Sequence, residues 1–303
     1  MKIEKVVLDQ KRGVVLYAYL NHWTSATFGG YPRRGAVVVC PGGAFMVHAG
    51  SEGEPIAMAF AGAGYQTFLL RYGIGRHAQF PGPICDAALA VACIRQHAEE
   101  WEIDPDKIAL CGFSAGGYVA SALGALWNRE DIQQYSGHTG DEIRPNALIL
   151  GYPLTAVEAL RNQVTELLSG GNITPERFER FSPQKWVGAH TPPTFLWNIY
   201  ADTLIPVEDG LEFCLALARH DVPFELHTFQ EGGHGCGLAT PVTSLGDEGL
   251  ENAQVSKWFG LCCGWLARRF GPPQLPEDAI IGFDMPKGER AHQGQSNLPQ
   301  SLL

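Results

Sequence analysis

Short apolar segments that alternate with longer stretches of helical periodicity constrain the fold of this chain most strongly. Ala36–Cys40 is an unbroken apolar run, which is typical of a strand covered on both faces. A chain in which such strands alternate with helices folds as a mostly parallel sheet wrapped by helices. The sequence therefore predicts an α/β fold built on an eight-stranded, mostly parallel sheet.

The expected elements follow from apolar periodicity and from the positions of turn residues. Strands are expected at Lys5–Leu8, Val14–Leu20, Ala36–Cys40, Gln66–Leu70, Ile108–Cys111, Ala147–Leu150, Thr194–Tyr200 and Phe224–Phe229. Helices are expected at Ile56–Gly62, Cys85–Glu99, Gly117–Leu126, Val207–Arg219 and Gln254–Arg269. The last of these helices carries an apolar stripe, which we expect to pack on the sheet.

We expect one domain to span residues 1–270. Residues of about 152–190 lie between the sixth and seventh strands and predict a small cap insertion, because a connection of this length is usually functional. Residues 271–303 contain several prolines and glutamines and few aromatic residues, and they predict an extended C-terminal tail.

The composition argues against several classes of function. Hydrophobic residues make up 45% and charged residues 18% of the 303 residues, so the chain can bury a large core. A formal net charge of −10 argues against nucleic-acid binding, because phosphate contacts need a basic surface. Without a signal peptide or a membrane-length apolar run, we expect a cytoplasmic protein with no membrane partner. The eight cysteines form no C-x-x-C pair and are expected to be buried, reduced thiols.

The strongest chemical signal is the segment Gly112–Gly117, which has the pattern G-x-S-x-G around Ser114. It follows an expected strand and opens an expected helix. Small residues two before and two after the serine relieve the crowding of such a tight turn. The pattern predicts that Ser114 is a nucleophile presented at the end of the sheet.

A serine hydroxyl becomes a strong nucleophile only when a base takes its proton. His234 lies between glycines in Gly233–Gly235, just after the eighth strand, where a sharp loop can present its ring. We therefore prefer it as the base over the other histidines considered, which are His48, His77, His190, His220 and His227.

A carboxylate is needed to hold the imidazole in the right tautomer. Asp202 is the first acidic residue after the seventh strand, whereas Glu208 and Asp209 open the following helix. The chain order Ser114, Asp202, His234 is the one expected for such a triad on this fold.

The tetrahedral intermediate of acyl transfer needs N–H donors for its oxyanion. The segment Cys40–Phe45 follows the third strand and contains two glycines, which let the backbone approach a ligand. We expect the oxyanion donors to be the amides of Gly43 and Ala44, together with the amide of Ala115 after the nucleophile.

Together these segments resemble the bacterial acetyl-esterase and carbohydrate-esterase-like branch of the α/β-hydrolases, a neighbour of the hormone-sensitive-lipase-like esterases. The resemblance covers roughly residues 15–270. Lipase-like members carry His-Gly-Gly-Gly at the oxyanion loop, where this chain has Pro41 in place of the histidine and Ala44 in place of the third glycine. That departure favours the carbohydrate-esterase-like branch. The resemblance implies the α/β-hydrolase fold and short acyl esters, often acetyl groups on sugars, as substrates.

Three functions remain to be compared. The first is hydrolysis of a small-molecule carboxylic ester by the triad Ser114, Asp202 and His234, with no metal or cofactor. The second uses the same triad on an amide or peptide bond, as aryl formamidases do. The third is a non-catalytic binding module, which the presence of all three triad residues argues against.

A further set of residues is expected to line the substrate pocket. Its candidates are Phe45, His48, Tyr72, Trp186 and Tyr200. Packing in the core is an equal alternative for the four aromatic residues of this set.

Overall fold

The computed structural model of the chain describes residues 1–22, 33–156, 163–171 and 181–271. Within these ranges eight strands form one sheet in the order β1-β2-β4-β3-β5-β6-β7-β8. β2 pairs antiparallel with both β1 and β4, and every pairing from β4 across to β8 is parallel. The strands are β1 (Lys2–Asp9), β2 (Val14–Leu20), β3 (Arg34–Cys40), β4 (Gln66–Arg71), β5 (Ile103–Phe113), β6 (Ala147–Gly151), β7 (Thr194–Ile199) and β8 (Phe224–Phe229). The predicted eight-stranded, mostly parallel sheet is confirmed.

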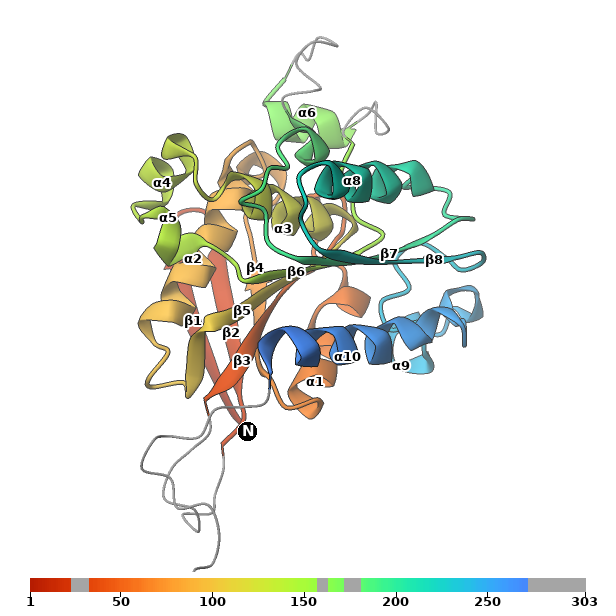
Figure 1. Cartoon of the computed structure of the whole chain (residues 1–303), viewed down its shortest axis with the longest axis horizontal. Coiled ribbons are helices and arrows are strands. Elements are labelled where there is room, and N and C mark those ends of the chain that lie inside the picture. The colour runs from red at the N-terminus through yellow and green to blue at the C-terminus, as the bar shows by residue number, and fades with distance from the viewer. Residues whose placement is uncertain (23–32, 157–162, 172–180, 272–303) are drawn as a thin grey trace, which may run out of the picture.

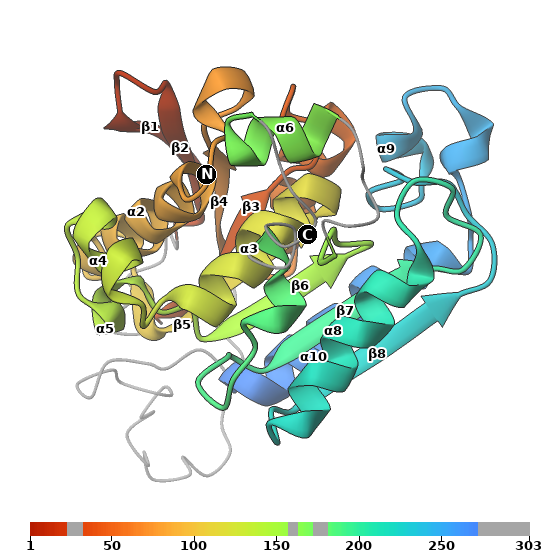
Figure 2. The same cartoon turned by 90° about the horizontal axis from the view of Figure 1, so that it is seen from above.

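Helices cover both faces of the sheet (Figure 1). One layer consists of α2 (Gly82–Gln96), α3 (Ser114–Leu126) and α8 (Val207–Arg219), and Figure 2 looks down onto it. The opposite layer contains α1 (Glu54–Gly62) and α10 (Trp258–Phe270). The shorter helices are α4 (Glu130–Ser136), α5 (Gly140–Ile143), α6 (Gln163–Ser169) and α9 (Pro241–Ser244).

The central strand β3 explains why its sequence is apolar without interruption. Ala36, Val38 and Cys40 belong to the core beneath α2, α3 and α8. Val37 and Val39 belong to the core beneath α1 and α10. Because successive side chains of a strand point to opposite faces, a strand covered by helices on both sides needs an apolar residue at every position.

The predicted boundaries differ from the observed ones by a few residues at several elements, and three of these differences have a clear physical reason. β1 extends beyond its predicted core because it is an edge strand whose half-exposed residues hide the apolar pattern. The helix expected from Gly117 begins at Ser114 itself, directly after β5. The last helix begins at Trp258 rather than at Gln254, because the side-chain oxygen of Asn252 accepts the amides of Gln254 and Val255 and forms a turn there.

The predicted cap and tail are described only in part. α6 lies within the predicted cap, and the amide of Phe80 donates a hydrogen bond of 2.8 Å to the carbonyl of Leu168 on that helix. Residues 157–162 and 172–180 of the cap, and the predicted tail from residue 272 onward, lie outside the described residues. Of the helices that the described ranges contain, none combines the length and the apolar character needed to cross a membrane. All eight cysteines carry free thiols, and seven of them are buried.

Candidate active site

Ser114 occupies the tight turn between β5 and α3. Its backbone has φ +49°, in the left-handed region that L-residues other than glycine rarely adopt. Glycines make this turn possible: a Cβ atom on Gly112 would lie 2.2 Å from the carbonyl oxygen of Gly116, and one on Gly116 would lie 1.9 Å from that of Cys40. The G-x-S-x-G pattern is therefore a steric requirement of the tight turn that presents the serine hydroxyl at the end of β5.

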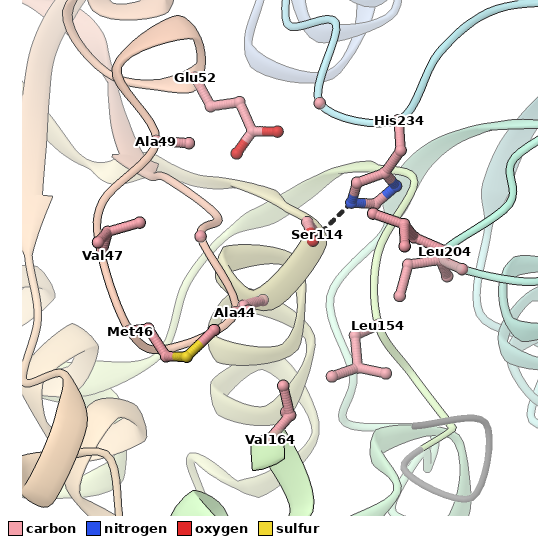
Figure 3. A pocket seen from close by; sticks show the side chains of 14 residues that line it. Ala44, Met46, Val47, Ala49, Glu52, Ser114, Leu154, Val164, Leu204 and His234 are labelled. Atoms are coloured by element: carbon pink, nitrogen blue, oxygen red, sulfur yellow. Dashed lines mark hydrogen bonds between the residues drawn. The ribbon is translucent and has the colours of Figure 1, made fainter. Parts of the chain in front are cut away.

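The imidazole of His234 lies between Ser114 and Asp202, as Figure 3 shows for its bond to the serine. His234 Nδ1 is 2.7 Å from Asp202 Oδ2, and His234 Nε2 is 2.9 Å from Ser114 Oγ. An ionised carboxylate can only accept, so Nδ1 carries the proton and donates to Asp202. Nε2 is then free to accept the proton of the serine hydroxyl, which is the arrangement needed for general-base activation.

The carboxylate of Asp202 is held on both of its oxygens. Its Oδ1 accepts the amides of Leu204 at 2.8 Å and Ile205 at 3.0 Å, while Oδ2 accepts from His234. Burial by itself raises the pKa of Asp202, but the hydrogen bonds from His234 and the two amides lower it to below its ordinary value. The carboxylate is thus kept ionised in the position where it orients the imidazole.

The three residues predicted to supply the oxyanion donors, Gly43, Ala44 and Ala115, line the same cavity as Ser114. Within the part of the chain that the structure describes, no group accepts the amides of Gly43 and Ala44. The amide of Ala115 lies in the first turn of α3, where amides lack an intrahelical acceptor. Gly43 has φ +113°, and a Cβ atom there would lie 2.3 Å from the carbonyl oxygen of Val47, so this position requires glycine.

The cavity above Ser114 has a volume of about 620 Å³ and a largely apolar wall (Figure 3). Its apolar side chains come from the oxyanion loop, the segment after β6, helix α6 and the loop after Asp202. They include Ala44, Met46, Val47, Leu154, Val164, Leu204 and Ile205. Because Val164 belongs to α6, part of the predicted cap contributes to the wall.

The pocket candidates named from sequence lie elsewhere. Phe45 is fully buried, and its ring packs edge-on against those of Tyr72 and Tyr118. Tyr72 is also buried, and its hydroxyl donates a 2.6 Å hydrogen bond to the carbonyl of Pro41. Both residues therefore support the oxyanion loop from the core and do not form the cavity wall. The reason is local: φ +53° at Ala44 and +59° at Phe45 turn the loop so that the phenyl ring faces inward.

The other three candidates also lie outside the wall of the cavity, each in a different place. The ring of His48 lies 3.1 Å from the carbonyl of Tyr72 and borders a different cavity. Trp186 packs against the rings of Phe80 and Tyr118. Tyr200 is 68% exposed on the loop after β7. The prediction of an aromatic pocket is corrected to an aliphatic one.

Some of the residues that line the cavity can be recognised, though only weakly, from their positions in the sequence. Met46 and Val47 follow the oxyanion loop directly, and Leu204 and Ile205 follow Asp202. Apolar residues in loops next to the site residues are candidates for a pocket wall. Glu52 also lines the cavity. Its segment, Glu52–Ala57, belongs to the family resemblance, but an acidic residue with a second acid at Glu54 is not a candidate for an apolar wall.

The chain is similar to several known esterases and related enzymes. The chain is 33% identical to endo-1,4-beta-xylanase B of Butyrivibrio fibrisolvens over 68% of its own length, and 26% identical to an acetylxylan esterase of Xylanibacter ruminicola over 69%. It spans only 33% and 42% of the length of these two relatives. Its structure is similar to that of the carboxylesterase Cest-2923 from Lactobacillus plantarum, with a TM-score of 0.80, 26% identity, and 89% and 98% of the two chains covered.

A family model also matches the chain. The BD-FAE model covers residues 31–217, which is more than half of the 303 residues and includes the oxyanion loop, Ser114 and Asp202. The sheet order, the serine turn and the structural likeness together confirm the predicted α/β-hydrolase fold. The chain therefore belongs to the BD-FAE family and is an α/β-hydrolase of the carbohydrate-esterase-like kind that its motifs predicted.

Proposed function

We propose that this chain hydrolyses small carboxylic esters through an acyl-enzyme on Ser114. The observation that carries the proposal is the position of His234, whose two ring nitrogens lie 2.9 Å from the hydroxyl of Ser114 and 2.7 Å from the carboxylate of Asp202. A base that is oriented by a carboxylate and bonded to a hydroxyl is the arrangement that activates a serine. The esterase relatives and the esterase-like structure support the same reaction class.

In the first half of the reaction, Ser114 Oγ attacks the ester carbonyl carbon and its proton passes to His234 Nε2. Asp202 stabilises the imidazolium that forms. The carbonyl oxygen becomes an oxyanion, which we expect to accept hydrogen bonds from the amides of Gly43, Ala44 and Ala115, three residues that line the cavity. The tetrahedral intermediate collapses, the alcohol leaves with the proton from His234, and the acyl group stays on Ser114.

In the second half, a water molecule replaces the alcohol. His234 takes a proton from the water, whose oxygen attacks the acyl carbon and forms a second oxyanion in the same place. Collapse of this intermediate returns the proton to Ser114 Oγ and releases the carboxylic acid. Every proton is carried by one imidazole, so this scheme uses no group beyond the chain and water.

For the substrate we propose short acyl esters, with acetyl groups on carbohydrates as the first class to test. The aliphatic wall formed by residues such as Met46, Leu154 and Val164 suits a small acyl chain. The carbohydrate part of the proposal draws on the similarity to an acetylxylan esterase. The cavity of about 620 Å³ has room for acyl groups larger than acetyl, so acyl length is a variable of the test.

The test is a comparison of p-nitrophenyl esters of increasing chain length with acetylated xylo-oligosaccharides, using the wild-type protein and Ser114→Ala. We expect turnover by the wild type and none by the variant. A p-nitroanilide of the preferred acyl group is the matched amide, and we expect its turnover to be much slower. Ester turnover by Ser114→Ala at the wild-type rate would overturn the proposal.

A further inference from the structure

Glu52 is a completely buried acid that contacts the oxyanion loop. It lies in the short 3-10 helix Gly50–Glu52, is 1% exposed, and its Oε2 accepts the amide of Gly42 at 2.7 Å. Gly42 immediately precedes Gly43, one of the proposed oxyanion donors. Figure 3 shows the carboxylate of Glu52 directed towards the side of the cavity where Ser114 and His234 lie.

The second oxygen of the same carboxylate is linked, through Tyr152, to the loop that carries His234. Glu52 Oε1 accepts the hydroxyl of Tyr152 at 2.8 Å, and that hydroxyl oxygen accepts the amide of Gly237 at 3.0 Å. The ring of Tyr152 also packs beside the imidazole of His234, with 4.9 Å between the ring centres. A chain of three hydrogen bonds therefore joins Gly42 to Gly237 through Glu52 and Tyr152.

These two loops come from distant parts of the sheet, after β3 and after β8. Beside the link through Glu52, the hydroxyl of Ser51 donates to the carbonyl of Gly235 at 3.2 Å. The loop after β8 is fixed from below as well, since the indole nitrogen of Trp258 donates to the carbonyl of Gly237 at 2.9 Å. The donors for the oxyanion and the base for the serine are thus held in one network.

A buried carboxyl group in this position has an energetic cost. Burial raises the pKa of Glu52 above its ordinary value, and the hydrogen bonds from Tyr152 and Gly42 and the nearby His234 only partly oppose that effect. Burying Glu52 costs free energy, yet its two oxygens accept hydrogen bonds from the amide of Gly42 and the hydroxyl of Tyr152. A buried group that bonds to two separate loops helps to fix their relative position.

We infer that Glu52, acting through Tyr152, is a positioning residue that sets the oxyanion loop relative to the His234 loop. The inference rests on the proposed ester hydrolysis. Its consequence is kinetic: the link adds little to substrate binding but keeps the oxyanion donors and the base aligned when the tetrahedral intermediate forms. A shift of about 1 Å between such groups is enough to cost about a hundredfold in rate.

Two substitutions alter the link at different bonds. In Glu52→Gln the side-chain oxygen still accepts the amide of Gly42, but the side-chain nitrogen can only donate to the hydroxyl oxygen of Tyr152, so the proton of that hydroxyl loses its acceptor. In Tyr152→Phe both the bond to Glu52 and the acceptor of the Gly237 amide are lost. The matched control is Tyr118→Phe, because Tyr118 is equally buried and its hydroxyl has no partner among the described residues.

The experiment measures kcat and KM for p-nitrophenyl acetate, together with the melting temperature, for these variants and the double variant. We expect kcat to fall about tenfold to a hundredfold in both single variants while KM changes less than about threefold. The double variant should be no slower than the slower single variant, because both changes break one link. Tyr118→Phe should keep the wild-type kcat.

The outcomes separate this inference from the proposed function. A wild type that turns over ester and loses that activity in Ser114→Ala, together with unchanged kcat in folded Glu52→Gln and Tyr152→Phe, overturns the positioning role alone. The positioning role is also overturned if the fall in kcat of the double variant equals the product of the falls in the two single variants. Failure of both single variants to fold would assign the pair to stability and end the inference. A wild type inactive on every ester tested would remove the proposed function and the inference together.

Discussion

The carbonyl oxygen of Cys40 lies 1.9 Å from the point where a Cβ atom on Gly116 would be. The end of β3 and the first turn of α3 are therefore in backbone contact, and the oxyanion loop starts from that contact. The distance between Ser114 and its proposed oxyanion donors is set by this packing of main chain against main chain, which leaves room for no side chain.

Replacement of Gly116 by alanine should therefore damage both stability and activity. The added methyl group has to displace main-chain atoms, and overpacking of this kind costs about 1–3 kcal/mol. We expect Gly116→Ala to lower the free energy of unfolding by that amount and kcat at least about a hundredfold. The control is Gly62→Ala in α1, where a Cβ atom would meet nothing within 4 Å. Urea denaturation and ester turnover measure both, and a Gly116→Ala protein as active as the control would contradict the packing argument.

The strained backbone at Ser114 predicts a difference between two inactive variants. Ser114→Gly and Ser114→Ala both remove the hydroxyl, but φ +49° is easy for glycine and unfavourable for alanine. We expect Ser114→Gly to be the more stable of the two by about 1 kcal/mol. Chemical denaturation of the two proteins at the same pH gives the comparison. Equal stability, or a more stable alanine variant, would show that the turn relaxes when the serine is lost.

The pKa of Asp202 predicts how its contribution to stability depends on pH. The hydrogen bonds from His234 and two amides lower this pKa in the folded protein, whereas Asp202 in the unfolded chain has an ordinary pKa of about 3.9. A lowered carboxyl pKa stabilises the fold above the unfolded value, and that contribution is lost as the pH falls through the folded value. We expect the melting temperature of the wild type to exceed that of Asp202→Asn at neutral pH, and the gap to close below about pH 4. A gap that is constant or grows towards acid pH would contradict the sign of the shift.

The aliphatic wall predicts a change in acyl selectivity at Val164. This residue of α6 is 8% exposed and lines the cavity. A phenylalanine there should fill space that a long acyl chain needs but an acetyl group does not. We expect Val164→Phe to lower kcat/KM for p-nitrophenyl octanoate about tenfold more than for the acetate, which corresponds to about 1.4 kcal/mol. Glu166→Phe, on the same helix but outside the cavity wall, is the control. Equal losses on the two esters in Val164→Phe would exclude this residue from the acyl site.

The fold, and the meeting of Ser114, Asp202 and His234 at one edge of the sheet, were predictable because each depends on a local sequence pattern. The apolar run of β3 indicates that both faces of the strand are covered. The glycines two residues before and after Ser114 indicate a turn that leaves no room for side chains. Asp202 and His234 each follow a strand of the parallel part of the sheet, and parallel strands end at a common edge.

The pocket wall was not predictable because it depends on the direction of side chains in loops. Ala44 and Phe45 both have a left-handed backbone conformation, which turns the phenyl ring into the core. Nothing in the identity of these two residues predicts that conformation. Glu52 acts through Tyr152, which is 100 residues away in the chain, so its role depends on a contact that only the folded structure contains. Val164 reaches the cavity through the placement of α6.

Covalent labelling of the serine tests the central claim most directly. The protein is treated with a fluorophosphonate, which reacts with an activated serine, and the intact mass and the modified peptide are determined by mass spectrometry. We expect one adduct per chain, on the peptide that contains Ser114, with no adduct in Ser114→Ala and much slower labelling in Asp202→Asn. A protein that hydrolyses esters but carries the label on another residue, or carries none at all, would contradict the account.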